Sequence, residues 1–322
     1  MGIASGRHGG IVADVPATEQ RGTCQAMTDT VIAASGLHKH YDEVRAVDGI
    51  ELDIARGECF GLLGHNGAGK TTTIRMLTCR TRPTSGNATV LGHDILEARH
   101  EIRPRISLVS DQQNLHPRLS ARATLQFWGA LYGADLDRVD GLLQLVGLEP
   151  ERATPVRDYS TGMRQRLVIA RALVNEPEVI FLDEPTRGLD PASSRTLRGI
   201  VRNLLDGGTT VFLTTHDMAE ADELCDRVAF MSSGRLVAVD SPRALRLAHV
   251  ERTGVGMAVT LDDGAQLELR IDDVADRLRF DELAAAGRVR TAHTTEPTLA
   301  DVFVDLVGRP LDEAASQVAE AS

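Results

Sequence analysis

The fold is decided by one stretch of eight residues, Gly64-His65-Asn66-Gly67-Ala68-Gly69-Lys70-Thr71. It matches the pattern G-x-x-x-x-G-K-[ST] between a buried strand, residues 59–63, and a helix predicted from Thr72. Glycines let the backbone curl so that N–H groups point at phosphate oxygens, and the positive end of the helix adds to the attraction. Lys70 can reach the β- and γ-phosphates, and the Thr71 hydroxyl can ligate Mg²⁺. The loop and Thr72 therefore predict a site for a nucleoside triphosphate.

A second motif stands at the end of another predicted strand. The run is hydrophobic and closes on two carboxylates, Val179-Ile180-Phe181-Leu182-Asp183-Glu184. Ligands of open α/β sheets bind at the carboxyl ends of the strands. Asp183 can orient Mg²⁺ or its water shell, and Glu184 can activate the attacking water as a general base. Two acids at a strand end often mark only a turn, but the glycine loop upstream and the run 185–190 directly after favour the functional interpretation.

A third motif distinguishes among proteins that carry such a loop. The motif is Tyr159-Ser160-Thr161-Gly162-Met163, placed before a predicted helix and 23 residues ahead of Asp183 (183 − 160). A Ser and a Gly that open a helix can form an anion site suited to a γ-phosphate. Ser at a helix start is also a common N-cap that needs no ligand. The spacing and the Gln165-Arg166 pair that follows favour the anion site.

In this order the three motifs resemble those of the ATPase subunits of ABC transporters, over about residues 31–240. The resemblance implies a head-to-tail dimer with two ATP molecules. Each ATP is held between the glycine loop, or P-loop, at residues 64–71 of one subunit and the signature, residues 159–163, of the other. It places Tyr41 against adenine and His216 against the γ-phosphate, beside the catalytic residues Lys70 and Glu184. It also places Asp190, the D-loop acid, at the dimer interface.

One position departs from the family pattern. The family usually carries a Gln after the strand that follows the P-loop helix, as a Mg²⁺ ligand and a link to the membrane subunit. Alignment of residues 106–111 puts Asp111 there, with Gln112 and Gln113 immediately after. Either Asp111 takes the metal role, which a carboxylate can do, or the loop shifts and Gln112 serves.

The signature and the C-terminal run Glu296-Pro297-Thr298-Leu299-Ala300-Asp301-Val302-Phe303 resemble the subfamily that serves bacterial drug and antibiotic exporters, daunorubicin-resistance-like. The implied function is ATP hydrolysis that powers export of a drug, antibiotic, lipid or similar substrate through a separate membrane permease. The implied location is the cytoplasmic face of the bacterial cell membrane. Two alternatives stay open: a non-transport ABC ATPase acting on ribosomes or DNA, and a nucleotide-binding regulator without turnover.

Composition limits the possible partners of the chain. The formal net charge is −11, with a pI near 5.4, which argues against electrostatic binding to DNA or RNA. No stretch of the 322 residues approaches the roughly 18–20 consecutive apolar residues of a membrane span. We therefore expect no nucleic-acid partner, and we expect any membrane role to come through another protein.

Strands that alternate with helices predict an α/β fold with a mostly parallel sheet covered on both faces. The resemblance makes this a P-loop NTPase: a RecA-like mixed sheet with a helical subdomain, plus a small C-terminal α+β domain. We expect an ATPase domain at 30–245, with a helical insertion at about 112–170, followed by an accessory domain at 246–308. The extension at 1–29 and the tail at 309–322 are expected to be disordered, and the start of the protein is expected at Met1 or Met27. Leu125, Phe127, Leu131, Leu142, Leu143 and Leu145 carry the helical spacing of the insertion.

A pair of histidines, His38 and His40, has a spacing that could place two imidazoles on one metal ion. The sequence offers no third ligand nearby. We therefore interpret the pair as part of a solvated loop.

Overall fold

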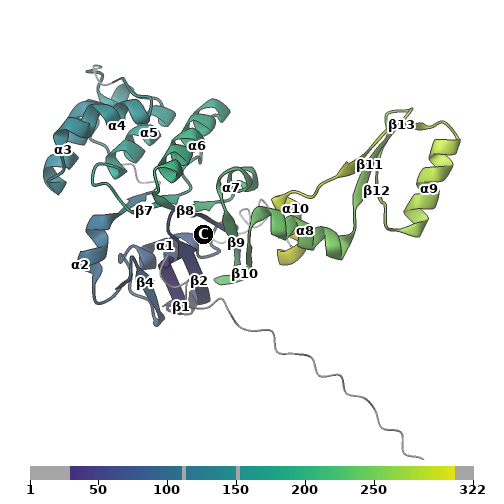
Figure 1. The fold of residues 1–322 in the computed structure, drawn as a ribbon, viewed down its shortest axis with the longest axis horizontal. Coiled ribbons are helices and arrows are strands. Elements are labelled where there is room, and N and C mark those ends of the chain that lie inside the picture. The colour runs from purple at the N-terminus through teal and green to yellow at the C-terminus, as the bar shows by residue number, and fades with distance from the viewer. Residues whose placement is uncertain (1–29, 111–113, 150–152, 309–322) are drawn as a thin grey trace, which may run out of the picture.

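A six-stranded sheet forms the centre of the main body in this computed structural model, which describes residues 30–110, 114–149 and 153–308 (Figure 1). Its strand order is β10-β9-β3-β8-β7-β6, and neighbouring strands are parallel except for the antiparallel pair β9 and β10. The strands are β3 (Cys59–Leu63), β6 (Ile106–Val109), β7 (Val179–Asp183), β8 (Thr210–Thr215), β9 (Arg227–Ser232) and β10 (Arg235–Asp240). The predicted fold class is confirmed in this sheet.

The two faces of this sheet bury alternate residues of its central strands. On β3, Phe60 and Leu62 join one core, whereas Cys59 and Leu63 join the other. Side chains alternate along a strand, so a run that is apolar throughout must be covered on both faces. One cover is helical, with α5 (Thr161–Ala172), α6 (Pro191–Asp206) and α7 (Met218–Leu224) packed into the same core.

The other cover is not purely helical. It consists of α1 (Lys70–Leu77) and a second, antiparallel sheet of order β2-β1-β4-β5. Its strands are β1 (Thr30–Tyr41), β2 (Val44–Ala55), β4 (Ser85–Val90) and β5 (His93–Asp94). The apolar run at residues 31–33 and the alternation of apolar and polar residues at 50–54 predict β1 and β2. The sequence does not predict β4, β5 or their union in a separate sheet, since Ser85–Val90 has few apolar residues.

The predicted helical insertion contains α3 (Ala121–Tyr132) and α4 (Val139–Leu145) ahead of α5, with α2 (Arg99–Ile102) before it. Ser120 caps α3 by accepting a hydrogen bond from the Ala123 N–H, and Gly133 ends the helix at φ 68°. Not all apolar side chains of the insertion are buried. Leu125, Leu142 and Leu143 are buried, but Phe127 and Leu131 of α3 are 58% and 64% exposed.

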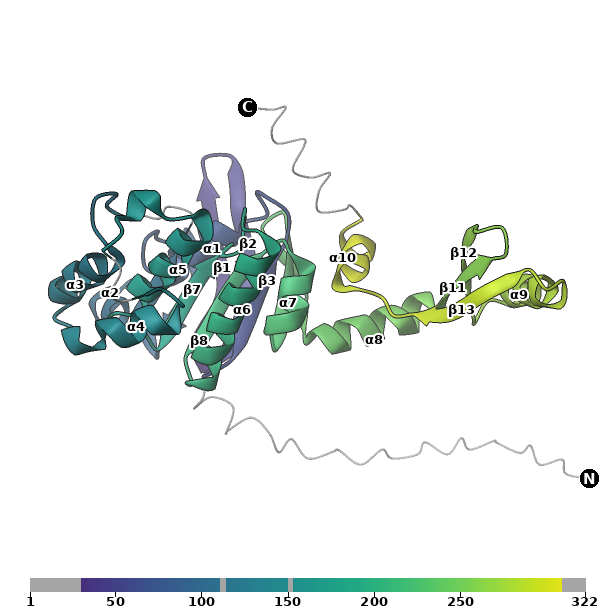
Figure 2. The same ribbon diagram turned by 90° about the horizontal axis from the view of Figure 1, so that it is seen from above.

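The chain leaves the main body along α8 (Pro242–Thr253) and forms an arm (Figures 1 and 2). The arm, residues 254–297, holds a three-stranded sheet of order β12-β11-β13 and one helix, around a small core of Val259, Leu261 and Leu269. Its elements are β11 (Gly256–Leu261), β12 (Gln266–Arg270), α9 (Val274–Ala285) and β13 (Val289–Thr295).

The last described helix, α10 (Leu299–Val307), returns to the main body rather than to the arm. Phe303 packs edge-to-face on Phe230 of β9 at a ring-centroid distance of 5.4 Å. The expected accessory domain at 246–308 is therefore divided, because α10 belongs to the core of the main body.

No helix within the described residues is both long and apolar enough to cross a bilayer. The expectations for residues 1–29 and 309–322, and those for Asp111 and Gln112, fall on residues outside the described part of the chain.

Candidate functional site

The glycine loop joins the end of β3 to the start of α1, and two of its glycines have no room for a side chain. Gly69 has φ 114°, and a Cβ there would lie 2.3 Å from the Ala46 carbonyl oxygen. A Cβ on Gly64 would lie 2.3 Å from the Met231 carbonyl oxygen. Strands β2 and β9 therefore lie directly against the loop, and a side chain at Gly64 or Gly69 would collide with their backbone.

Lys70 opens α1, and its side chain lies almost entirely inside the protein. Its Nζ donates to the carbonyl oxygens of Gly64 at 2.5 Å and His65 at 3.3 Å, and it lies 3.4 Å from Glu184 Oε1. Burial lowers the pKa of Lys70, and the Glu184 carboxylate opposes this shift. The ammonium group is thus surrounded by oxygens of the protein, and phosphate oxygens of a ligand could take their place.

Asp183 ends β7 between two threonine hydroxyls. Thr71 Oγ1 donates to one carboxylate oxygen at 3.0 Å, and Thr214 Oγ1 donates to the other at 2.5 Å. The hydroxyl and the carboxylate are hard oxygen ligands, the kind that Mg²⁺ prefers. The sequence did not single out Thr214, although its place two residues before His216 on β8 could have suggested it.

Glu184 follows in an unusual backbone conformation, with φ 51°. This left-handed region costs a residue with a side chain about 1–3 kcal/mol and is often found at functional sites. Here it turns Glu184 toward both Lys70 and His216, whose Nδ1 lies 2.7 Å from Glu184 Oε2. The backbone N–H of Glu184 donates to the Thr214 carbonyl at 2.9 Å, which holds the turn in place.

Glu184 and His216 shift each other's pKa. Burial raises the pKa of Glu184, but the hydrogen bond from His216 and the charge of Lys70 outweigh it, so the pKa lies below its usual range. The hydrogen bond to Glu184 raises the pKa of His216, against the effect of burial. Glu184 is therefore an ionised carboxylate in a largely buried position, as a general base requires.

Lys70, Thr71, Asp183 and Glu184 line a cavity of about 620 Å³. Thr214 and His216 contact these two acids but are not among the residues that line the cavity. Tyr41, 43% exposed, lines the same cavity with Val44, Arg45 and Ala46 of β2. The cavity accordingly brings an aromatic ring and the glycine loop together in one space. Sequence reasoning missed several lining residues, namely Val44, Arg45, Ala46, Arg75, Arg187 and Ser233, because only the fold brings them to the loop.

The signature residues lie elsewhere on the chain. None of residues 159–163, all of them described, lines the cavity. Tyr159 is buried in the helical core, whereas Ser160 and Thr161 are exposed at the start of α5. Ser160 is also an N-cap, since its Oγ accepts from the Met163 N–H at 3.1 Å.

The D-loop acid lies beside the signature in the same chain. A Cβ on Gly162 would lie 2.5 Å from Ser193 Oγ, so the start of α5 abuts the start of α6. Asp190 caps α6 by accepting from the Ala192 and Ser193 N–H groups and from Ser193 Oγ at 2.6 Å. The Ser193 hydroxyl is the main cause that lowers the pKa of Asp190.

The sheet order, the glycine loop and the acidic end of β7 together define a P-loop nucleoside triphosphatase with a helical subdomain. The family model described as ABC transporter matches residues 47–187. This chain belongs to the ABC transporter family, as an ATP-binding subunit that hydrolyses ATP.

Relatives with known names are similar over most of the chain. A fluoroquinolones export ATP-binding protein of Mycobacterium tuberculosis (strain CDC 1551 / Oshkosh) is 43% identical over 286 residues, 87% of this chain and 94% of that protein. A daunorubicin resistance ATP-binding protein of Streptomyces coeruleorubidus is 38% identical over 320 residues, 90% of this chain and 100% of that protein. The predicted resemblance to daunorubicin-resistance-like proteins is confirmed.

Solved structures agree with this assignment. The cbiO1 protein of Clostridium perfringens, part of the ABC transporter complex cbiONQ, has a TM-score of 0.63 and 27% identity, covering 70% of this chain and 96% of its own. The bacterial ABC transporter cassette MJ0796, solved as a dimer, has a TM-score of 0.60 and 27% identity, covering 65% and 98%.

Proposed function

We propose that this chain powers export of a drug, antibiotic, lipid or similar substrate through a separate membrane permease, at the cytoplasmic face of the cell membrane. The observation that carries the proposal is the similarity to export ATP-binding proteins over 87–90% of the chain. Two structural features support it: a nucleotide site that is incomplete within one chain, and a groove outside that site with aromatic and arginine side chains in its lining.

The incomplete site supports a head-to-tail dimer. Ser160 and Thr161 are exposed at a helix N-terminus but do not line the cavity of their own chain. A second copy could place these residues over the γ-phosphate, where the positive end of α5 would add to the charge of Lys70. In this arrangement Glu184 accepts a proton from the attacking water, and His216 orients Glu184. Thr71 and Asp183 would hold Mg²⁺, which when bound neutralises charge on the phosphates.

Ser160→Arg should leave ATP binding by the single chain unchanged and abolish hydrolysis that depends on dimer formation. The long cationic side chain would occupy the place of the partner's γ-phosphate. The change also removes an N-cap, which costs about 1 kcal/mol of stability. ATPase rates measured as a function of protein concentration test the prediction.

The matched control for this variant is Ser241→Arg, because Ser241 caps α8 by accepting from the Ala244 N–H at 3.2 Å. Both variants lose a helix cap, but only the change at Ser160 should suppress turnover. Equal turnover in the two variants would contradict a role for the signature in the partner's site.

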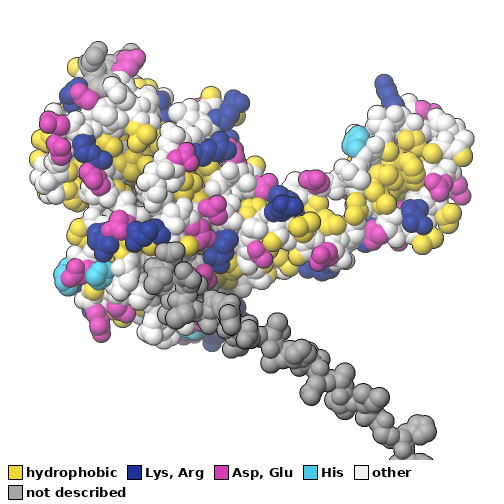
Figure 3. Space-filling view, in the orientation of Figure 1, with side chains coloured by type: hydrophobic (Ala, Val, Ile, Leu, Met, Phe, Trp, Pro, Cys, Tyr) yellow, Lys and Arg dark blue, Asp and Glu magenta, His cyan; other side chains and the backbone are white. Residues whose placement is uncertain are grey.

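The groove supports docking of a permease segment. A cavity of about 670 Å³ lies between β6 and helices α3 and α5, with Trp128 and Tyr132 on its wall and the guanidinium groups of Arg80 and Arg103 beside them. Aromatic and arginine side chains are enriched in protein interfaces. Exposed Phe127 and Leu131 extend the apolar surface of α3, and hydrophobic side chains reach the surface of this region in Figure 3.

Leu131→Asp should lower recovery of the permease by about tenfold or more, because it puts a charge into an apolar contact. The measurement is a pull-down with the tagged full-length chain from detergent-solubilised membranes of the native host. Leu278→Asp on α9 is the control, since Leu278 is 59% exposed on the arm and Leu131 is 64% exposed on α3. Recovery of ribosomal proteins in place of a polytopic membrane protein would contradict the transport role.

A further inference from the structure

Three potential metal ligands meet on the antiparallel sheet, away from the P-loop. His38 and His40 both lie on strand β1, and not in a loop as the sequence suggested. Asp48 lies on β2, where it is the register partner of His38. One ligand atom from each residue lies within 4.8 Å of the others. The missing third ligand is thus supplied by a neighbouring strand, which the spacing along β1 could not show.

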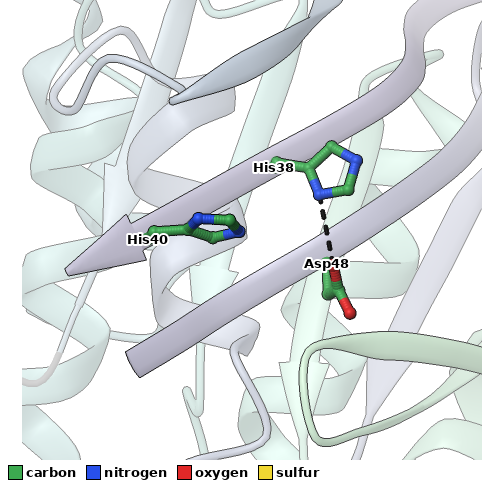
Figure 4. A group of neighbouring side chains, drawn as sticks. All are labelled: His38, His40 and Asp48. Atoms are coloured by element: carbon green, nitrogen blue, oxygen red, sulfur yellow. Dashed lines mark ion pairs between the residues drawn. The ribbon is translucent and has the colours of Figure 1, made fainter. Parts of the chain in front are cut away.

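The two histidines point toward a common space beside Asp48 (Figure 4). His38 Nδ1 lies 3.3 Å from Asp48 Oδ1, and the two imidazole rings are 6.0 Å apart between centroids, at 85° to each other. Nε2 of His40 is buried and has no hydrogen-bond partner among the described residues. A buried polar atom without a partner is uncommon and calls for an explanation, such as an ion.

The carboxylate of Asp48 is held in an orientation that leaves one oxygen for a metal ion. Arg235 donates to Oδ2 through Nη2 at 2.7 Å and Nε at 2.8 Å, so Oδ1 remains directed toward His38. The more distant Arg45 Nη1, at 3.9 Å, also faces Oδ2. A partner that fixes the second oxygen of a ligating carboxylate is a common feature of metal sites.

We propose that His38, His40 and Asp48 bind a divalent transition metal of the Zn²⁺ class, at a site separate from that of the nucleotide. Two imidazoles and one carboxylate suit Zn²⁺, whereas Mg²⁺ prefers oxygen ligands alone. Tetrahedral Zn²⁺ bonds of about 2.0–2.2 Å place neighbouring ligand atoms about 3.4 Å apart. The pair His38 and Asp48 already has this spacing, whereas the set with His40 lies within 4.8 Å, so the His40 side chain would have to move closer when the ion binds.

The bound ion would join β1 to β2 close to the turn of the hairpin that carries Tyr41. Tyr41 follows His40 directly and lines the nucleotide cavity, together with Val44 of β2. The metal would therefore fix the two strands that bring Tyr41 and Val44 to the nucleotide cavity.

The test is a titration of the full-length chain with Zn²⁺ against a chromophoric indicator, in excess Mg²⁺ to fill the oxygen-lined site. The wild-type chain should bind one Zn²⁺ at this cluster. His40→Gln should weaken that binding by about 100-fold or more, since loss of a mere supporting group already costs 10–100-fold. His40→Gln breaks no side-chain hydrogen bond at Nε2, so the fold should persist. Asp48→Asn provides a second variant with the same expected loss.

His100→Gln is the control, because His100 is an exposed histidine outside the cluster and should bind Zn²⁺ as the wild type does. Substitution of Co²⁺ for Zn²⁺ gives a second readout. A visible band without a thiolate charge-transfer band supports the histidine and carboxylate ligands. Wild-type Zn²⁺ affinity in His40→Gln, or a thiolate band that this variant retains, would overturn the proposal.

Discussion

Glu184→Gln is expected to bind ATP as the wild type does and to hydrolyse it about 10²- to 10⁴-fold more slowly, the usual contribution of a general base. Glutamine has nearly the same shape but cannot accept a proton from water. It also removes the negative charge 3.4 Å from Lys70 Nζ, so phosphate binding should not weaken. Because the bound ATP persists, ATP-bound dimers should accumulate, which size-exclusion chromatography with ATP and Mg²⁺ would detect.

Glu178→Gln is the matched control for this prediction. Glu178 immediately precedes β7, whereas Glu184 follows its carboxyl end, and its ion pairs with Arg56 and Arg105 lie outside the nucleotide cavity. The control should retain wild-type turnover. A rate for Glu184→Gln within about tenfold of the wild type would exclude Glu184 as the base.

Lys70→Ala has the second large expected effect, a loss of ATP affinity of about 10- to 100-fold. This range corresponds to the 1.5–3 kcal/mol of a hydrogen bond to a charged group. Lys70 is 5% exposed, and its ammonium group is held by the loop itself, so it needs little reorganisation to meet phosphate oxygens. Isothermal titration calorimetry with ATP measures the loss.

The control for Lys70→Ala removes a positively charged side chain outside the nucleotide cavity. Arg99 is exposed on α2 and outside the cavity, so Arg99→Ala should bind ATP with wild-type affinity. Thermal unfolding of both variants checks that the fold persists. Unchanged ATP affinity in Lys70→Ala would contradict phosphate binding by the glycine loop.

The sequence predicted those parts of the fold and site that depend on local pattern. The strand Cys59–Leu63, the glycine loop and the helix after it follow one another directly, and β7 ends on Asp183, as expected. Each of these elements carries its own signal: a buried apolar run, glycines where no Cβ fits, or acids at a strand end.

The parts that the sequence did not predict depend on contacts between distant segments. Thr214 reaches Asp183 only because β7 and β8 are parallel neighbours in one register. The cluster of His38, His40 and Asp48 depends on the pairing of β1 with β2, which includes several register shifts. A single-residue slip would move Asp48 to the other face, so local pattern could not locate this cluster.

The helical spacing of α3 was predicted from the sequence, but which of its apolar side chains are buried was not. Leu125 and Leu131 have the same chemistry on the same helix, and one is fully buried while the other is 64% exposed. Periodicity gives the faces of a helix, but only the neighbouring elements determine which face is covered.

The return of α10 to the main body has a mechanical consequence for the arm. A domain on a single flexible linker changes orientation freely, whereas the arm is anchored at both its entrance and its exit. The two anchoring helices are joined side by side, since Asp305 of α10 pairs with His249 Nδ1 at 3.1 Å and with Arg252. Arg246 of the same helix α8 pairs with Asp222 of α7, the helix that begins two residues after His216. Because both connections of the arm are fixed in this way, the arm has little freedom to rotate on its own. A tilt of α7 would therefore be passed through α8 to the arm.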